Sequence, residues 1–456
     1  MTNLHSRSLS SALVVLIASG ALAVACGPKG DDASPPTPPA ASDAGTSGSD
    51  AASSSDGQTT PSSTSAKIGT GEQNTCAILD GGGVKCWGSD AAGQLGQARG
   101  DYKNELAPKP LAPIDLEGRK AVSVGAGKEH ACALFDDGKV KCWGNNTLGG
   151  ALGIGGNFGS AGGSANTMGA NLPVVELGGK AVALTVGTLH NCALLEDGTA
   201  KCWGNNDGGA LGMASTDDYW TPGRAIDAGA KIKMISAGYR YTCAVLEDGI
   251  LKCWGDNVTG TLGLGDTENR ANKPGQTVAA LPAVDVGGKV VSVSAGYYHT
   301  CALLEGGKVK CWGSNRSGEL GQGDIESRGT KPNEMGAKLP PIDLDGVATA
   351  VVAGDASTCA LLEGGKVKCW GANDAGTVGL GEPGPRGYRP NEMGKNLPAL
   401  DLPPTVALSM RSKHVCATST TGEVRCWGSN SHGQLGYGDR EPRALVGAKT
   451  PAIALE

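Results

Sequence analysis

The sequence predicts an all-β fold, a closed ring of seven four-stranded β-sheet units, on the strength of three observations. A pair of cysteines with one fixed spacing recurs seven times, and each second cysteine precedes Trp-Gly. The 456-residue chain has 74 glycines but only 4% aromatic residues, which favours tight turns and short strands over large helical cores. A short apolar segment precedes every repeat except the first, and a further copy ends the chain.

One repeat is seen in residues 290–323, which read VVSVSAGYYHTCALLEGGKVKCWGSNRSGELGQG. VVSVS alternates apolar and polar residues as a half-buried strand does, and TCALL and KVKCW are two further strands. The loop between them ends in Gly307, and a glycine recurs at this place in every repeat. A three-residue hairpin requires a left-handed residue there, which glycine adopts without a steric cost. Each repeat therefore contains three strands, the last two forming a hairpin.

The fourth element of each unit is a segment of the type PIDL, first seen at residues 113–116. The first repeat lacks it, but PAIALE at residues 451–456 supplies the missing copy. In a ring, a C-terminal strand beside the first unit closes the circle and removes exposed sheet edges, whereas an open solenoid gives no reason for this placement. The repeat averages about 57 residues. We therefore predict a single seven-bladed β-propeller over residues 66–456, in which no blade is stable alone.

The repeated cysteines lie directly opposite each other when the hairpins are drawn in register. Opposed residues on neighbouring strands have Cβ atoms about 4.5–5.5 Å apart, near the range of a disulfide, so we predict seven cross-strand disulfides. Structural zinc normally requires four closely spaced ligands, and a redox site would require one special pair, so both are weaker interpretations. Reduced packing thiols are a further alternative. The predicted pairs are Cys76 with Cys86, Cys132 with Cys142, Cys192 with Cys202, Cys243 with Cys253, Cys301 with Cys311, Cys359 with Cys369, and Cys416 with Cys426.

The first 25 residues have the pattern of a secretory signal peptide, with an apolar run too short to span a membrane as a mature helix. The run ends in LAVAC, which resembles the lipobox of bacterial lipoproteins, although Ala23 stands where leucine is usual. The resemblance implies lipidation of Cys26, the fifteenth cysteine, and anchoring in the bacterial cell envelope. In such lipoproteins Gly27 after the cysteine implies sorting to the outer membrane. An ordinary secretion signal, with Cys26 incidental, is the alternative.

Residues 26–65 are rich in serine, proline and alanine and contain almost no large apolar residue. Such a segment cannot bury enough surface to offset its ordering entropy, so we expect a disordered tether between the lipid anchor and the propeller. No later stretch is apolar enough to span a bilayer. The chain thus divides into a signal peptide, a tether and one repeat domain.

A family resemblance appears in the pattern G-x-x-H-T-C-A-L-x-x-x-G-x-V-x-C-W-G-x-N-x-x-G-x-L-G-x-G, which recurs with variations in all seven units. The pattern resembles the repeat of the regulator of chromosome condensation family, in the cysteine-rich form found in secreted bacterial proteins. This resemblance implies a propeller with a protein-binding surface more than a reaction. The family's founder is a guanine-nucleotide exchange factor that binds chromatin. An exported chain with net charge −6 and no Lys/Arg cluster does not suit that role, and we expect no nucleic-acid binding.

Candidate ligand contacts lie in the variable loops, since binding residues on repeat scaffolds usually stand there. The loop GMASTDDYWTPG contains Tyr219 and Trp220, and Trp220 is the only tryptophan outside the repeated position. Exposed tyrosine and tryptophan are frequent binding hot spots and also stack on sugars. The alternative is that Trp220 folds back to cover its own blade.

Two repeated residue types offer weaker sites. Four histidines lie two residues before a first cysteine, and we interpret them as bonded to local backbone instead of as metal ligands or catalysts. Three aspartates follow the glycine-rich return and suggest calcium only weakly, because a lone carboxylate per loop is a poor site. These residues are His130, His190, His299, His414, Asp266, Asp324 and Asp439.

No nucleophile elbow, phosphate loop or H-E-x-x-H motif occurs in the sequence. We therefore expect a non-enzymatic, lipid-anchored extracytoplasmic scaffold that recognises a protein or an envelope glycan or other polymer through its propeller loops. No cofactor or metal is implied, and a closed ring needs no second copy, so we expect a monomer. The alternatives are a glycan-acting enzyme with a site in the channel or on the loop face, and GTPase regulation by family analogy.

Overall fold

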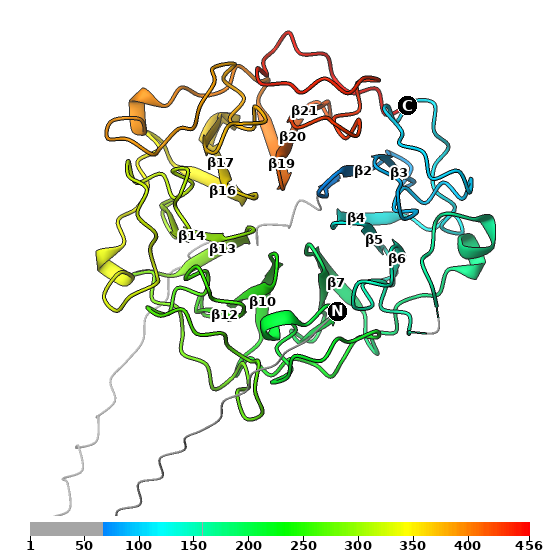
Figure 1. Ribbon diagram of the computed structural model, residues 1–456, viewed down its shortest axis with the longest axis horizontal. Helices are drawn as coiled ribbons and strands as arrows, with labels where there is room; N and C mark the ends of the chain where they lie inside the picture. Colours follow the sequence, from blue (N-terminus) through cyan, green and yellow to red (C-terminus); the bar gives the residue numbers. More distant parts are fainter. Residues whose placement is uncertain (1–66, 157) are drawn as a thin grey trace, which may run out of the picture. The chain divides into compact units, whose positions relative to one another are not determined.

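The computed structural model describes residues 67–156 and 158–456, and within them seven antiparallel sheets of three strands each stand in a ring around a central axis (Figure 1). The all-β, seven-bladed prediction is therefore confirmed. The predicted signal peptide, the lipidation site Cys26 and the tether fall outside the described residues. None of the helices in the described part has the length and apolarity needed to cross a bilayer.

Each blade consists of consecutive strands, ordered from the axis outwards. The strands are β1(Ile68–Thr70), β2(Asn74–Ile78) and β3(Val84–Gly88); β4(Ala121–Ala126), β5(His130–Phe135) and β6(Val140–Gly144); β7(Ala181–Val186), β8(His190–Leu195) and β9(Ala200–Gly204); β10(Ile232–Ala237), β11(Tyr241–Leu246) and β12(Leu251–Gly255); β13(Val290–Ala295), β14(His299–Leu304) and β15(Val309–Gly313); β16(Ala348–Ala353), β17(Ser357–Leu362) and β18(Val367–Gly371); β19(Thr405–Arg411), β20(His414–Ser419) and β21(Val424–Gly428). Six single turns of 3-10 helix are η1(Ala165–Thr167), η2(Gly169–Asn171), η3(Asp207–Gly209), η4(Gly336–Lys338), η5(Glu363–Gly365) and η6(Gly394–Asn396).

The prediction of four-stranded blades is wrong, because the fourth segment does not form a strand. In the first blade the segment at residues 113–116 makes one backbone hydrogen bond to β3, from Ile114 N–H to the carbonyl oxygen of Val84 at 2.8 Å. Directly afterwards the Asp115 carboxylate accepts the N–H of Glu117 at 3.1 Å, and this turn leads the chain away. The same single bond recurs in all seven blades. The segment is therefore a strap across the outer strand.

The C-terminal segment also belongs to a different blade from the one predicted. Ile453 N–H bonds to the carbonyl oxygen of Val424 in β21, at 2.8 Å, so residues 451–456 form the strap of the seventh blade. The strap of the first blade is residues 113–116, and every blade is continuous in sequence. The C-terminal segment still reaches the first blade, since Lys85 Nζ donates to the carbonyl oxygen of Leu455 at 2.7 Å. No strand is exchanged at ring closure, because each blade supplies its own strap.

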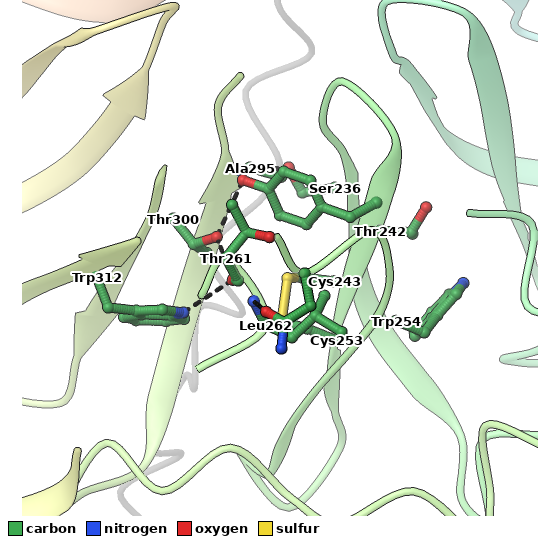
Figure 2. Close-up of a disulfide and its surroundings, with 12 residues drawn as sticks. Ser236, Thr242, Cys243, Cys253, Trp254, Thr261, Leu262, Ala295, Thr300 and Trp312 are labelled. Carbon is green, nitrogen blue, oxygen red and sulfur yellow. Dashed lines mark hydrogen bonds between the residues drawn. A yellow bond between two sulfur atoms is a disulfide. The ribbon is translucent and has the colours of Figure 1, made fainter. Parts of the chain in front are cut away.

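Each repeated tryptophan is fully buried and bonds to the preceding blade. In Figure 2, Trp312 Nε1 donates to the carbonyl oxygen of Thr261 at 2.9 Å. The same bond joins Trp143 to Gln94, Trp203 to Ala151, Trp254 to Ala210, Trp370 to Glu319, Trp427 to Thr377, and Trp87 to Gln434. The bond from Trp87 joins the first blade to the last and so closes the ring.

A disulfide joins the second and third strands of every blade, as Figure 2 shows for Cys243 and Cys253. In all seven pairs the two cysteines are direct partners in the strand register, with Cα atoms 4.0–4.1 Å apart. Within residues 67–156 and 158–456, no group of three or more His, Cys, Asp or Glu side chains is arranged to hold a metal ion. The cysteines therefore act as structural cross-links inside the blades.

Candidate recognition surface at the channel mouth

Seven loop tips stand around the axis of the ring at one of its ends, which we call the mouth, because each innermost strand ends there and turns into the second strand of its blade (Figure 1). The backbone links neighbouring tips. Tyr239 N–H donates to the carbonyl oxygen of Gly296 at 3.2 Å, and Tyr297 N–H donates to that of Gly354 at 2.9 Å. Asp355 N–H likewise donates to the carbonyl oxygen of Ser412, in the next blade, at 3.1 Å. The first residues of the tips are, in ring order, Glu72, Lys128, Thr188, Tyr239, Tyr297, Asp355 and Ser412.

Three tyrosines from two adjacent tips form a cluster at this mouth. The rings of Tyr239 and Tyr297 are stacked, with centroids 4.1 Å apart. Tyr298 meets both edge-on, at 6.1 Å from Tyr239 and 5.1 Å from Tyr297. Tyr298 is 40% exposed, which is unusual for so large a side chain in this protein. We call these three residues the tyrosine cluster.

The surroundings of the tyrosine cluster hold it in place. The guanidinium of Arg240 lies 4.9 Å from the Tyr239 ring centroid and pairs with Asp207 at 3.3 Å. Thr259 Oγ1 donates to the carbonyl oxygen of Tyr298 at 3.1 Å. Beside Thr259, Val258 is 63% exposed. Aromatic, arginine and aliphatic side chains thus meet at one place on the loop face.

Hydrogen bonds from two side chains join blades that are not neighbours in the ring. Arg411 extends from β19 and donates to the carbonyl oxygens of Val186 at 2.6 Å and Ala237 at 3.3 Å, in the third and fourth blades. The Tyr297 hydroxyl donates to the Glu72 carboxylate of the first blade at 3.1 Å. Desolvation lowers the pKa of Arg411 to about 10, so it stays charged at neutral pH. Polar contacts thus tie together residues of the first, third, fourth, fifth and seventh blades across the ring.

Burial also acts on two carboxyl groups of the mouth. Desolvation raises the pKa of Glu72, although the hydrogen bond from Tyr297 opposes the shift. Desolvation likewise raises the pKa of Asp355, which lines a shallow pocket with Asp374 and Lys413. Lys413 is bonded to Asp374 at 2.9 Å. The positive charge of Lys413 opposes the shift at Asp355.

The sequence-predicted contacts Tyr219 and Trp220 are both only partly exposed. Tyr219 pairs with Gly204 through two backbone hydrogen bonds, of 2.9 and 3.0 Å. The carbonyl oxygen of Trp220 accepts the N–H of Gly155 at 2.8 Å, and a side chain added at Gly150 would collide with Trp220. Trp220 therefore covers a loop of the neighbouring second blade. The alternative drawn from the sequence was that it covers its own blade. Their role as ligand contacts remains a prediction.

The repeated histidines bond to the neighbouring blade, so the interpretation of local backbone bonding is wrong. Each fully buried ring faces a threonine or asparagine of the following blade. Burial lowers the pKa of these rings to about 4, or to about 3 for His190, so they are neutral at physiological pH. The distances are 2.9 Å from His130 to Asn191, 2.8 Å from His190 to Thr242, 2.8 Å from His299 to Thr358, and 3.0 Å from His414 to Thr75.

The three aspartates considered for calcium are engaged with an arginine four residues later. The pairs are Asp266 with Arg270 at 2.5 Å, Asp324 with Arg328 at 2.7 Å, and Asp439 with Arg443 at 2.8 Å. Each aspartate also accepts a hydrogen bond from a side-chain amide of its own loop. Each of these carboxylates therefore joins residues within its own return loop.

Sequence reasoning missed the tyrosine cluster and the bridge from Arg411. One signal was present: the two residues before the histidine position differ from repeat to repeat, as Tyr-Arg in AGYRYTC and Tyr-Tyr in AGYYHTC, while the cysteine that follows them is constant. Positions that vary on a constant scaffold are candidates for binding. Only the closed ring of blades shows that these variable positions lie together at the mouth.

Comparison with known proteins gives matches over most of the chain. Residues 116–452 match the RCC1-like domain, and residues 82–134 and 66–94 match the regulator of chromosome condensation (RCC1) repeat. The chain is 31% identical over 390 residues to the ultraviolet-B receptor UVR8 of Arabidopsis thaliana, covering 82% of this chain and 79% of that protein. It is 30% identical over 391 residues to the E3 ubiquitin-protein ligase HERC2 of Homo sapiens, of which it spans only 7%. A crystal structure of Kap60 bound to yeast RCC1 (Prp20) matches with a TM-score of 0.64 and 21% identity, covering 84% of this chain and 83% of that one, which shows a shared fold.

Proposed function

Because the chain belongs to the RCC1-like family, we propose that it is a non-enzymatic, lipid-anchored extracytoplasmic scaffold that recognises a protein or an envelope polymer through its propeller loops. Its relatives suggest a protein-binding or regulatory role. Yeast RCC1, which shares the fold, has been crystallised with Kap60 bound to it, so one protein of this fold has a protein partner. The partner itself does not transfer to this chain, because a shared fold does not carry function.

The observation that carries this proposal is the tyrosine cluster, in which Tyr298 is exposed, on the loop tips that backbone hydrogen bonds link. Tyrosine and arginine are the residues most often found at binding hot spots, and here they occur together. The tips are tied to one another by backbone bonds. A surface that is already ordered loses little conformational entropy when a ligand binds, so little binding free energy is spent on ordering the loops.

Seven disulfides support export, since such bonds form and persist in an oxidising extracellular environment. The proposed anchor is a lipid on Cys26 within the lipobox-like LAVAC. Intact mass spectrometry with free-thiol labelling on protein from its native envelope tests this part. An acylated Cys26 with fourteen unlabelled cysteines is expected. An unprocessed N-terminus with reactive thiols would contradict export and reopen GTPase regulation.

Photo-crosslinking in cells tests the binding surface. A photoreactive amino acid at Tyr298 is compared with one at Glu305, an exposed residue at the opposite end of the same strand. We expect a discrete adduct from position 298 and none from position 305. Adducts of equal yield at both positions would contradict recognition by the loop face. Turnover of an envelope glycan by the purified chain would contradict a non-enzymatic scaffold and favour the glycan-acting enzyme.

A further inference from the structure

A cavity of about 390 Å³ lies at the tip of the sixth blade. Its lining comes from that tip, from the return loop of the same blade, and from Lys413 of the seventh tip. None of the three residues of the tyrosine cluster lines it, so it is a separate feature of the mouth. Small-molecule sites occupy roughly 300–1,000 Å³, so this cavity has room for one small ligand unit.

The cavity is formed where the sixth tip has unusually small side chains. Ala356 and Ser357 stand at the places that Tyr298 and His299 occupy in the fifth blade, and no other tip has so small a pair. The backbone of the two tips is held alike, because the carbonyl oxygens of Ala356 and Tyr298 accept the same bond from the return loop, at 2.8 and 2.9 Å. The shorter side chains therefore leave space that larger ones fill in the other blades.

Ser357 presents a buried hydroxyl to this cavity. It is 3% exposed and lines the cavity, and within residues 67–156 and 158–456 its hydroxyl takes part in no hydrogen bond. In four other blades a histidine at this position bonds to the following blade. Val415 stands at the partner position in the seventh blade, paired with Trp427 as Thr75 is paired with Trp87, and offers no acceptor. Buried polar groups without a partner are uncommon, and a ligand in the cavity would supply one.

The charged residues of the cavity disfavour a charged ligand. Lys413 is paired with Asp374 at 2.9 Å, and its positive charge also acts on Asp355. A cation would be repelled by Lys413, and an anion by the two carboxylates. A neutral ligand with hydrogen-bond donors and acceptors meets neither repulsion.

The hydrogen-bonding groups of the cavity narrow the class of neutral ligand. The Asp355 carboxylate only accepts, Lys413 only donates, and the hydroxyls of Ser317 and Ser357 do both. A peptide offers one donor and one acceptor per residue, which is too few for four polar side chains around so small a cavity. A sugar has hydroxyl groups on neighbouring ring carbons, each of which donates and accepts, and two of them match the two oxygens of one carboxylate.

The walls of the cavity are ordered by hydrogen bonds of their own. Asn373 Nδ2 donates to the carbonyl oxygen of Glu382 at 2.6 Å, and Thr377 Oγ1 donates to that of Lys413 at 3.3 Å. Asn373 and Thr377 both line the cavity. Groups that are already held in place lose little conformational entropy when a ligand binds, which favours binding of a small ligand.

Resting on the proposed function, in which the partner is a protein or an envelope polymer, we propose that the cavity of the sixth blade binds one neutral saccharide unit. Hydroxyl groups of the sugar bond to the Ser357 hydroxyl and the Asp355 carboxylate. Ala356 and Pro385 also line the cavity and offer apolar surface to the C–H face of the ring. The inference thus selects a glycan among the partners that the proposed function allows.

The test measures binding to the full chain by saturation-transfer difference NMR titration. The probes are the methyl β-glycosides of glucose, galactose, mannose and N-acetylglucosamine, which differ in the arrangement of their polar groups. We expect at least one to bind saturably. Tetrahydropyran-2-methanol, which keeps the ring and lacks most of the hydroxyls, and N-acetylglycine methylamide, a neutral peptide unit, should not bind. Binding should be insensitive to salt, because the ligand is neutral.

Substitutions place the sugar in this cavity. Ser357→Ala should weaken binding about fivefold, the size of one neutral hydrogen bond, and Asp355→Asn about tenfold, because hydrogen bonds to charged groups are stronger. Ala356→Tyr, which gives the sixth tip the residue of the fifth, should fill the cavity and remove binding. Its matched control is Gln73→Tyr, the same change at the same place in the first tip, where the residue is exposed and binding should stay as in the wild type.

Three results would overturn the inference. They are no binding by any of the four glycosides, binding of the peptide unit with equal strength, and glycoside binding that survives both Ser357→Ala and Ala356→Tyr. The first would leave the cavity without a saccharide ligand, and the second would assign it to a protein segment. The third would place the sugar elsewhere on the chain.

The two proposals fail in different ways. If position 298 crosslinks a partner but no glycoside binds, the scaffold stands and the saccharide inference falls. If a glycoside binds and Ala356→Tyr removes the binding, but no adduct forms at position 298 in cells, the cavity stands and recognition through the tyrosine cluster falls.

Discussion

Trp87 Nε1 donates a 3.0 Å hydrogen bond to the carbonyl oxygen of Gln434, and thereby joins the first blade to the seventh by the same bond that joins every other neighbouring pair. The ends of the propeller thus meet as an ordinary blade interface. At this interface the carbonyl has a second donor, because Thr75 Oγ1 bonds to it at 2.8 Å. In the second blade Ala131 stands at the position of Thr75. In the described residues, Trp143 is therefore the single side-chain donor to the carbonyl oxygen of Gln94.

This difference predicts unequal costs for the same substitution. Trp143→Phe should destabilise the propeller more than Trp87→Phe, by about 1–2 kcal/mol, because it leaves the buried carbonyl oxygen of Gln94 without a donor. In Trp87→Phe the oxygen of Gln434 keeps the Thr75 hydroxyl. The loss of ring volume is common to both variants and cancels in the comparison. Free energies of unfolding from urea titration check it, and equal losses would refute the role given to Thr75.

The histidine contacts predict a stabilising pair of substitutions at the interface of the first two blades. There Asn74 takes the histidine's place and its buried side-chain amide has no hydrogen-bond partner in the described residues. The position of the histidine's partner is occupied by Ala131, which pairs with Trp143 as Thr300 pairs with Trp312. Gly71 precedes Asn74 as Gly127 precedes His130, and Gly127 lies against that histidine ring, so the space for a ring is provided. Asn74→His combined with Ala131→Thr should raise the free energy of unfolding by about 1 kcal/mol.

The single variants are the controls for that pair. Asn74→His alone gains no acceptor across the interface, and Ala131→Thr alone gains only a bond to Gln94, so neither should give the full effect. A double-mutant cycle measures the coupling directly. Additive single effects would show that the histidine contact contributes nothing to the interface.

Much of the fold was predictable from the sequence, and the reason is that its elements are local. The hairpin glycine and the constant cysteine spacing determine the register of the second and third strands, and Cys301 lies opposite Cys311 as expected. The straps were misassigned because a four-residue apolar segment reads the same whether it precedes or follows a blade. Only the bond from Ile453 to Val424 decides the matter.

The candidate site was hardly predictable, because it depends on closure of the ring. Glu72 and Tyr297 are 225 positions apart in sequence, and Arg411 reaches the third and fourth blades from the seventh. No local pattern marks such contacts. The sequence pointed instead to Trp220, whose rarity was visible, although its backbone and ring are occupied by the loop of a neighbouring blade.

Acidification should weaken the propeller between about pH 6.5 and pH 4. The four buried histidines have pKa values lowered to about 3–4 in the folded state, below the value of about 6.5 expected when unfolded. As the pH falls through this window the unfolded chain binds protons that the folded chain does not, so stability falls, and it levels off for these groups once the folded values are passed. Each histidine contributes a slope of about 1.4 kcal/mol per pH unit.

The histidine origin of that slope is checked by substitution. His299→Gln should remove about a quarter of the histidine slope, measured by urea unfolding at several pH values, because one of four equivalent groups is gone. His432→Gln is the comparison and should remove less of the slope. Burial lowers the pKa of His432 as well, but this ring is only partly buried and bonds to Ser431 beside it. An unchanged slope in His299→Gln would assign the acid sensitivity to carboxyl groups instead.

Each disulfide should add to the stability of the propeller without being required for the ring to form. Each closes a loop with a sequence separation of 10, for which the chain-entropy account gives about 3 kcal/mol at most. Replacing Cys301 and Cys311 together by alanine should therefore lower the free energy of unfolding by about 2–3 kcal/mol while the propeller still folds, because Trp312 keeps its bond to Thr261. Replacing Cys359 and Cys369 in the next blade should cost the same, since its tryptophan bond is equivalent. Urea titration measures the free energy of unfolding of both double variants, and near-ultraviolet circular dichroism reports whether each still folds. Loss of all cooperative unfolding in either variant would show that the blades depend on their cross-links more than on packing against their neighbours.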